Sequence, residues 1–422
     1  MKRLLFLIYI SVCAVAISLP ARAQTPHPAT KAAPADSAAE SQRDSVVISL
    51  LTCSPGSLVY ELYGHTALRV RTLSTGADWV FNYGTFSFRR PHFIWRFILG
   101  ETDYELSVSP YAFFYEAYMR EGRGIQEQRL NLTPEEERKL VDALSENLQP
   151  EKATYRYNFF YDNCTTRAID MISQAVDGKI TWPAAHPNTT FRGVVRKFAE
   201  KSPWNRFGQD LLLGAEADRP TTQRQQMFAP LYARDFLAEA VVTAPDGSRR
   251  KLASPAINLL PPAPAPDDAI PLTPLWTFGI LLAFTVVLTL YEWKRKRYFW
   301  PYDVLLFIAQ GAAGCIITLL FFASTHPTVG SNWLITFLNP LPLLWFPWFM
   351  KRAWAGRRSR AIYLQAAFCI VAFGACATGL QSYPPEALLI LCTLALRCVA
   401  HITQTRRRRP QGSHQPSPIS AQ

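Results

Sequence analysis

A cysteine and a histidine that lie far apart in the chain both have the surroundings that nucleophilic catalysis requires. Cys164 follows Asp162 and Asn163, two residue types that favour the start of a helix. In a first helical turn, free N–H groups and the helix dipole stabilise a thiolate. His65 directly precedes an apolar, strand-like segment, and an imidazole placed there can accept the thiol proton. We therefore expect Cys164 to be a nucleophile and His65 its general base.

The distribution of cysteines leaves one competing interpretation open. Apart from the N-terminal apolar stretch and the C-terminal apolar spans, the chain contains two cysteines, Cys53 and Cys164. In an oxidising compartment these two thiols could form a disulfide instead of a catalytic site. Cysteines and histidines are too sparse here for a structural zinc site, so we expect no metal and no cofactor.

A mixed α/β domain is expected to position both residues. Strands are predicted at 46–51, 67–71 and 79–83, from apolar and β-branched runs separated by turn residues. The pattern Thr-Pro-Glu-Glu, which begins at Thr133, is a capping box with proline at the first helical position and predicts a helix. A further helix is predicted to run from Cys164 towards Val176.

The segments that flank this domain have the composition of targeting and linking sequences. Residues 1–23 combine a basic start, an apolar stretch and an Ala-Arg-Ala ending, which predicts a secretory signal peptide, with an N-terminal anchor helix as the alternative. Residues 24–44, rich in Ala, Pro, Thr and Ser, predict a flexible linker. We assign 45–253 to an exported periplasmic domain and the Pro/Ala-rich residues 254–270 to a spacer.

The C-terminal part of the chain predicts a membrane bundle over 271–402, followed by a basic tail over 403–422. About five apolar spans are expected, at 271–291, 302–323, 333–350, 361–380 and 386–402. Tryptophan and tyrosine residues flank these spans, as is typical of membrane interfaces.

The distribution of charge supports a membrane bundle and argues against nucleic-acid binding. Residues 271–422 carry 14 basic and 3 acidic side chains, whereas 24–270 carry 27 and 29. The basic clusters follow apolar spans, which is the positive-inside pattern of an inner-membrane protein and not a nucleic-acid-binding stripe. The C-terminus is then cytoplasmic, and the loops at 324–332 and 381–385 face the same side as the periplasmic domain.

Four motifs stand out along the chain, at 51–56 (Leu-Thr-Cys-Ser-Pro-Gly), 63–70 (Tyr-Gly-His-Thr-Ala-Leu-Arg-Val), 81–84 (Phe-Asn-Tyr-Gly) and 161–167 (Tyr-Asp-Asn-Cys-Thr-Thr-Arg). They resemble the Lnb N-terminal periplasmic domain, a family found in Bacteroides and relatives and associated with lipoprotein N-acylation. The Tyr-Gly-His and Asp-Asn-Cys-Thr-Thr-Arg motifs are specific, whereas the others would be weak alone. Weaker likenesses occur at 100–104, 213–218, 228–230, 325–327, Asn332 and 339–341. The order of histidine, polar residue and cysteine also resembles the permuted branch of the NlpC/P60 superfamily.

The resemblance implies an α+β permuted papain-like (NlpC/P60-like) periplasmic domain followed by an all-α bundle of about five transmembrane helices. Carried over by position, Cys164 is the nucleophile, His65 the base and Asn82 the polar residue that orients the imidazole, with Asp103 as a rival for that role. Asn163 or the Cys164 backbone amide would supply oxyanion donors.

Further substrate-binding roles follow from the same resemblance. Arg167 would hold a phosphate or pair with Asp170. Tyr83, Asp103 and Tyr104 belong to the motifs and are also expected at the site. His326 is expected near the outer mouth of the bundle.

The resemblance implies a membrane-embedded, cysteine-dependent acyltransferase. It would move an acyl chain from a phospholipid, through a thioester, to the α-amino group of a diacylglyceryl-cysteine lipoprotein. The expected partners are thus a phospholipid donor, a lipoprotein acceptor and the membrane, and no nucleic acid. The alternatives are an NlpC/P60-like peptidoglycan hydrolase and a non-enzymatic envelope scaffold held by a Cys53–Cys164 disulfide.

Overall fold

A central strand, β1 (Val46–Cys53), organises the N-terminal domain. All of its residues except Val46 are buried, because protein covers both of its faces. The computed structural model describes residues 45–86, 91–263 and 272–405. The predicted signal peptide and the linker at 24–44 therefore lie outside the described residues.

Seven strands form the main sheet, and every neighbouring pair is antiparallel. In spatial order they are β10 (Ile257–Leu260), β5 (Ile125–Arg129), β1, β2 (His65–Thr72), β3 (Asp78–Thr85), β4 (Asp103–Pro110) and β6 (Thr154–Arg156). The three predicted strands are confirmed as β1, β2 and β3. One difference concerns the segment predicted as a spacer: its residues at β10 pair with β5, so the sheet extends beyond residue 253. A smaller sheet contains β7 (Lys179–Thr181), β8 (Val241–Thr243) and β9 (Arg249–Lys251).

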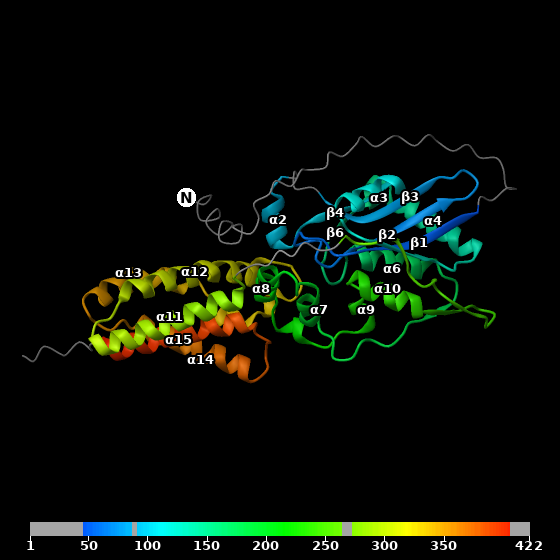
Figure 1. Cartoon of the computed structure of the whole chain (residues 1–422). Coiled ribbons are helices and arrows are strands. Elements are labelled where there is room, and N and C mark those ends of the chain that lie inside the picture. The colour runs from blue at the N-terminus through cyan, green and yellow to red at the C-terminus, as the bar shows by residue number, and fades with distance from the viewer. Residues whose placement is uncertain (1–44, 87–90, 264–271, 406–422) are drawn as a thin grey trace, which may run out of the picture. The chain divides into compact units, whose positions relative to one another are not determined.

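Helices cover both faces of the main sheet (Figure 1). On one face, α3 packs Phe114 and Tyr118 against Leu51 and Val80 of the sheet. On the other face, a larger core joins the strands to α4, α6 and α10. The helical segments of this domain are α2 (Phe93–Leu99), α3 (Tyr111–Arg120), α4 (Pro134–Asn147), α5 (Pro150–Ala153), α6 (Cys164–Ala175), α7 (Phe191–Phe198), α8 (Pro203–Leu212), η1 (Ala215–Asp218), α9 (Gln223–Gln226) and α10 (Pro230–Glu239).

The two predicted helix starts are both confirmed. The Thr133 side chain accepts a hydrogen bond from the Glu136 amide, and the Glu136 carboxylate accepts one from the Thr133 amide. The buried Glu136 carboxylate is also paired with Arg250, which compensates its charge. Leu140 and Leu144 of α4 pack on α6, so the capped helix supports the one that begins at Cys164.

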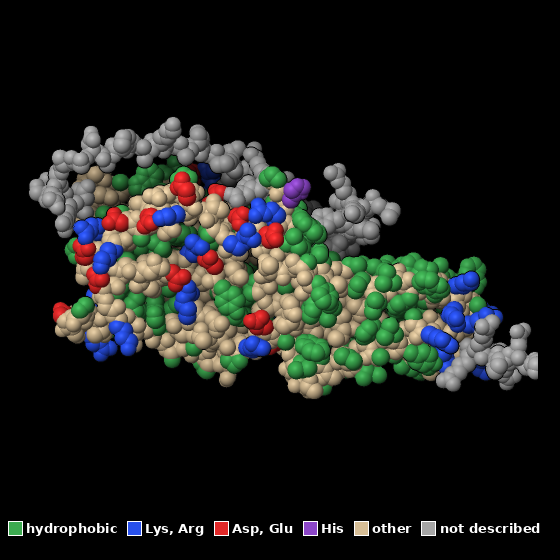
Figure 2. Space-filling model, turned by 180° about the vertical axis from the view of Figure 1, so that it is seen from behind, with side chains coloured by type: hydrophobic (Ala, Val, Ile, Leu, Met, Phe, Trp, Pro, Cys, Tyr) green, Lys and Arg blue, Asp and Glu red, His purple; other side chains and the backbone are tan. Residues whose placement is uncertain are grey.

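The C-terminal part folds as a bundle of apolar helices. Its elements are α11 (Pro274–Arg295), α12 (Trp300–Ala323), η2 (Val329–Ser331), η3 (Trp333–Thr336), α13 (Leu341–Trp354), α14 (Ala361–Ala377) and α15 (Pro385–Gln404). Within the described residues, four segments are long and apolar enough to cross a membrane, namely Pro274–Arg295, Trp300–Ala323, Trp333–Trp354 and Pro385–Gln404, while α14 is shorter. Figure 2 shows hydrophobic side chains along the surface of the bundle and a group of Lys and Arg at one of its ends.

A buried ion cluster ties three of these helices together. Arg397 of α15 is fully buried and bonds to Glu292 of α11 (2.7 and 3.0 Å) and to Asp303 of α12 (2.5 and 3.2 Å). Each charge in an apolar bundle needs such a partner. The arginine in the last apolar span is therefore a link within the bundle.

Both predicted outer loops contact the N-terminal domain. The Asn332 amide donates to the Leu211 carbonyl at 2.7 Å, and the Gln381 amide donates to the Leu213 carbonyl at 3.1 Å. Buried Arg192 of α7 holds the same segment, with 2.8 Å to the Leu213 carbonyl. These contacts place the loops on the same side as the domain, as the charge pattern predicts.

Candidate active site

Cys164 is the first residue of α6, directly behind a strong helix cap. The Asn163 oxygen accepts hydrogen bonds from the amides of Thr165 (2.9 Å) and Thr166 (3.0 Å), and the Thr166 hydroxyl accepts one from the Asn163 amide (2.8 Å). The cap therefore uses the second and third amides of the helix and not that of Cys164. As a residue Cys164 is half-buried, and its thiol lies at the positive end of the helix dipole, where the sequence predicts it.

The imidazole of His65, the first residue of β2, lies between Asn82 of β3 and Cys164. Nε2 of His65 donates to Oδ1 of Asn82 at 2.6 Å. A second side-chain hydrogen bond joins the imidazole to the Cys164 thiol. Because Nε2 is bonded to Asn82, Nδ1 is the ring nitrogen left to exchange a proton with sulfur. The structure thus brings together the three residues expected to be catalytic.

Electrostatics favour a thiolate–imidazolium pair. Burial alone would raise the pKa of Cys164, but the positive charge of His65 and hydrogen bonds from His65, Thr66 and Thr165 outweigh it. They lower the pKa of the thiol from its ordinary value near 9 to about 7. Burial disfavours the charged imidazole, yet the Cys164 charge and the bonds to Cys164 and Asn82 raise the pKa of His65. Sulfur is therefore substantially ionised near neutral pH.

Gly84 of β3 belongs to the 81–84 motif, but the sequence predicts no role for it, and the structure places it against Cys164 and His65. Gly84 has φ of +95°, and a Cβ there would lie 3.4 Å from Cβ of Cys164 and 3.8 Å from Cε1 of His65. The glycine allows the bulged end of β3 to pass next to the Cys164–His65 pair. Its position two residues after Asn82 was the available sequence signal. The hydroxyl oxygens of Thr66 and Thr165 are 3.1 Å apart, and the Thr165 hydroxyl is 3.8 Å from the Cys164 sulfur.

Comparison with known protein families shows two matches, which together cover most of the chain. Residues 34–197 match the Lnb N-terminal periplasmic domain, and residues 266–409 match the Lnb transmembrane domain. The chain belongs to the Lnb family. It is a membrane protein with a periplasmic N-terminal domain, as the sequence analysis predicts. No curated protein and no solved structure matches the chain significantly.

In this Lnb protein, one of the two expected oxyanion donors is already engaged in other hydrogen bonds. The side-chain amide of Asn163 donates to the carbonyls of Phe159 (2.8 Å) and Phe228 (2.9 Å), so both of its hydrogens are in use. Asn163 is therefore a helix cap that also holds neighbouring loops. Of the two expected donors, the backbone amide of Cys164 is the one that the Asn163 cap does not use.

Arg167 has a different partner from the one considered in the sequence. Its guanidinium makes two bonds to Asp162, at 2.6 and 2.7 Å, and stacks 3.7 Å from the centre of the Tyr155 ring. The expected alternative pairing with Asp170 is wrong, because Asp170 pairs with Arg224. Sequence spacing along α6 favoured Asp170, but the loop before the helix folds back and presents Asp162.

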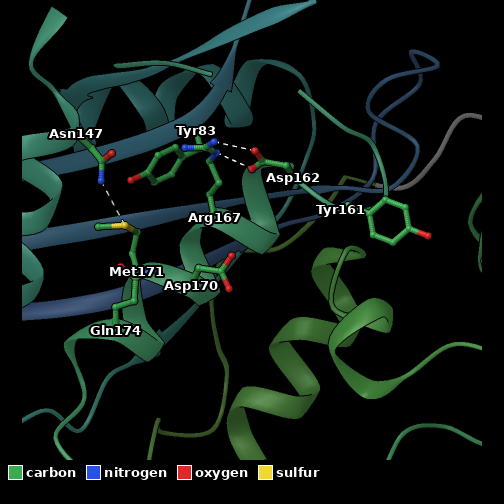
Figure 3. A pocket seen from close by; sticks show the side chains of 8 residues that line it. All are labelled: Tyr83, Asn147, Tyr161, Asp162, Arg167, Asp170, Met171 and Gln174. Carbon is green, nitrogen blue, oxygen red and sulfur yellow. Dashed lines mark hydrogen bonds and ion pairs between the residues drawn. The ribbon is translucent and has the colours of Figure 1, made fainter. Parts of the chain in front are cut away.

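The surroundings of Arg167 form a cavity of about 430 Å³, shown in Figure 3. It is lined by Tyr83, Asn147, Tyr161, Asp162, Arg167, Asp170, Met171 and Gln174. Tyr83 is buried, and its hydroxyl has no hydrogen-bond partner among the described residues. The lining includes neither Cys164 nor His65, and the Arg167 charge is already neutralised by Asp162. Tyr83 and Arg167 therefore line a cavity that is separate from the Cys164–His65 pair.

The remaining expected residues have distinct positions. Asp103 bonds to Arg96 (2.5 Å) and Arg156 (2.9 Å), so Asn82, and not its rival Asp103, contacts the imidazole. Tyr104 is buried and packs in the same core cluster as Cys164. His326, from the loop after α12, donates from Nε2 to the carbonyl of Phe97 at 2.5 Å.

The disulfide alternative is not formed. Cys53 and Cys164 are both free thiols. Cys53 is fully buried at the end of β1, and burial raises the pKa of its thiol to about 12, so it remains protonated and unreactive. The cysteine available for chemistry in the described part of the N-terminal domain is therefore Cys164.

Proposed function

We propose that this protein is a cysteine-dependent acyltransferase that N-acylates lipoproteins. The observation that carries the proposal is the Cys164–His65–Asn82 array in a domain that is hydrogen-bonded to the outer loops of a membrane bundle. A lowered thiol pKa beside an oriented imidazole is the requirement for thioester chemistry. Attachment to the bundle keeps the nucleophile near lipid substrates.

The first half-reaction acylates the enzyme. The Cys164 thiolate attacks the carbonyl carbon of a phospholipid ester, and a C–S bond forms while negative charge develops on the carbonyl oxygen. The Cys164 amide and the dipole of α6 stabilise that charge. The ester C–O bond then breaks, and the His65 imidazolium gives its proton to the departing lysophospholipid oxygen.

The second half-reaction transfers the chain. The neutral α-amino group of a diacylglyceryl-cysteine attacks the thioester carbon, His65 accepts the proton of the amine, and the C–S bond breaks to restore the thiolate. An α-amino group has a pKa of about 8, so a sufficient fraction is neutral near physiological pH. Asn82 keeps the imidazole turned towards sulfur in both steps.

The proposal also covers the fold group of the domain, the membrane that holds the bundle and the topology of the bundle. We assign the domain to the permuted papain-like group because His65, Asn82 and Cys164 follow in that order, with the cysteine helix packed on the sheet. We assign the bundle to the inner membrane with five spans and a cytoplasmic C-terminus. The basic residues exposed between α11 and α12 support this topology.

The test is the mass of lipoprotein N-termini in cells. In a strain whose chromosomal copy carries Cys164→Ser, mass spectrometry of lipopeptides should show diacyl and no N-acylated forms. A matched strain with Cys53→Ser, which changes a buried thiol outside the array, should retain N-acylation. Persistent N-acylation in the Cys164→Ser strain would contradict the proposal, and loss of peptidoglycan cleavage with normal lipoproteins would indicate a wall hydrolase.

A further inference from the structure

Helix α2 exposes large apolar side chains next to the membrane bundle. Ile94, Trp95 and Phe97 are 52, 52 and 45% exposed. The charged residue among them, Arg96, is instead held to the domain by Asp103 at 2.5 Å. A surface helix that presents apolar residues and ties back its charge is typical of contact with a lipid interface.

Hydrogen bonds join the end of α2 to the loop that follows α12. The Thr325 amide donates to the Leu99 carbonyl at 2.9 Å, and the Thr325 hydroxyl donates to the same oxygen at 3.0 Å. The approach is close, because a Cβ on Gly100 would lie 2.6 Å from the Thr325 hydroxyl oxygen. Phe322, in the last turn of α12, is 76% exposed. Helix α2 therefore lies at the level where α12 leaves the apolar layer.

A continuous row of aromatic rings leads from this point to the nucleophile. Successive ring centres are 5.3 Å apart for His326 and Phe97, 6.3 Å for Phe97 and Phe93, 5.8 Å for Phe93 and Phe86, and 4.9 Å for Phe86 and Tyr104. All of these are contact distances for aromatic pairs. Phe86, Tyr104 and Cys164 pack against the same core cluster. Burial and the nearby charge of Cys164 both raise the pKa of Tyr104, so the row ends close to the sulfur.

We propose that α2 lies in the interfacial layer of the outer leaflet and that the aromatic row guides the acyl chain of a phospholipid from the leaflet to Cys164. The guiding role rests on the proposed acyl transfer, whereas the position of α2 in the leaflet does not. The occupant is a lipid chain because the row begins at the outer end of the membrane bundle. Helix α2 contacts α12, and Phe322 near the end of α12 is exposed, as are the apolar side chains of α2.

The position of α2 is tested by photocrosslinking of the full-length protein in phosphatidylethanolamine/phosphatidylglycerol vesicles. Trp95→p-benzoylphenylalanine should yield phospholipid adducts on illumination, detected by mass spectrometry of the peptide. The control, Phe113→p-benzoylphenylalanine, is on α3 at a residue that is 64% exposed. It should give at least tenfold fewer adducts. No adducts at position 95, or as many at position 113 as at position 95, would overturn the placement of α2 in the leaflet.

The guiding role is tested with two donors that differ in chain length. Phe97→Ala should slow acylation of Cys164 by a 16-carbon phospholipid roughly tenfold and leave acylation by p-nitrophenyl butyrate unchanged. Phe113→Ala should alter neither rate. Equal slowing with both donors, or no slowing, would overturn the guiding role. If wild-type protein accepts no acyl chain while position 95 still crosslinks to lipid, the proposed function and the guide fail and the leaflet position stands.

Discussion

Replacing His65 removes the group that ionises Cys164, and the consequence can be worked out from the site. The pKa of the thiol is about 7 because the influence of His65 outweighs burial. In a His65→Gln protein burial remains, so the pKa should rise to about 9 or above. At pH 7 the ionised fraction then falls from about one half to about one hundredth, a roughly 50-fold decrease.

The loss of reactivity is smaller than the loss of thiolate. A thiolate of higher pKa is intrinsically more nucleophilic, by roughly 6- to 10-fold over two pKa units. The rate of modification at pH 7 should therefore fall by about 5- to 8-fold. The midpoint of the pH–rate profile does not depend on this compensation and is the better readout.

The assay is the rate of carbamidomethylation of the Cys164 peptide from pH 5 to 10, followed by mass spectrometry on detergent-solubilised full-length protein. Buried Cys53 is an internal control that should stay unmodified. His186→Gln, which changes a histidine packed on Tyr232 and Phe236, should keep the wild-type midpoint near 7. A wild-type midpoint near 9, or one that His65→Gln leaves in place, would refute the reasoning.

Three further predictions follow from the same structure. Asn82→Ala should leave the imidazole unoriented and reduce acyl transfer, measured as product formed per enzyme, by about 10- to 100-fold. Asn82→Asp keeps a hydrogen-bond acceptor for His65 and should lose less activity. Equal activity of the two variants would argue against an orienting role. Gly84→Ala should lower the free energy of unfolding by about 1–2 kcal/mol, seen as a lower unfolding temperature, and should also slow Cys164 modification. Gly76→Ala, at φ of +70° with open space around it, should show the backbone strain alone. Arg192→Met should lower the free energy of unfolding in urea by roughly 3 kcal/mol, because Asp218 loses its buried cation while Asp210 keeps only Arg196. A loss below about 1 kcal/mol would show that this buried ion pair is dispensable.

Local sequence signals predicted the elements that carry the catalytic residues. The run at β1, the capping box at Thr133 and the Asn163 cap are decided by neighbours within a few residues, so the sequence alone indicates them. The pairing of Cys164 with His65 could be proposed because their residue types are complementary. Its geometry depends on how β2 and α6 pack.

Features that depend on distant contacts were not predictable in the same way. Residues 257–260 lie in a Pro/Ala-rich stretch and become a strand because the edge of β5 accepts them. Arg167 prefers Asp162 to Asp170 because the loop before α6 folds back and the Tyr155 ring offers a stacking surface. The importance of Gly84 emerges only when the bulged end of β3 is seen against the sulfur.

The most direct test of the account is to trap the acyl-enzyme. Full-length protein incubated with a phospholipid and no lipoprotein acceptor should gain one acyl chain on the Cys164 peptide. The adduct should be removed by neutral hydroxylamine, as a thioester is, and should disappear when an acceptor with a free α-amino group is added. Acylation at another residue, or an unmodified Cys164 peptide under turnover conditions, would contradict the central claim that this thiol carries the chain.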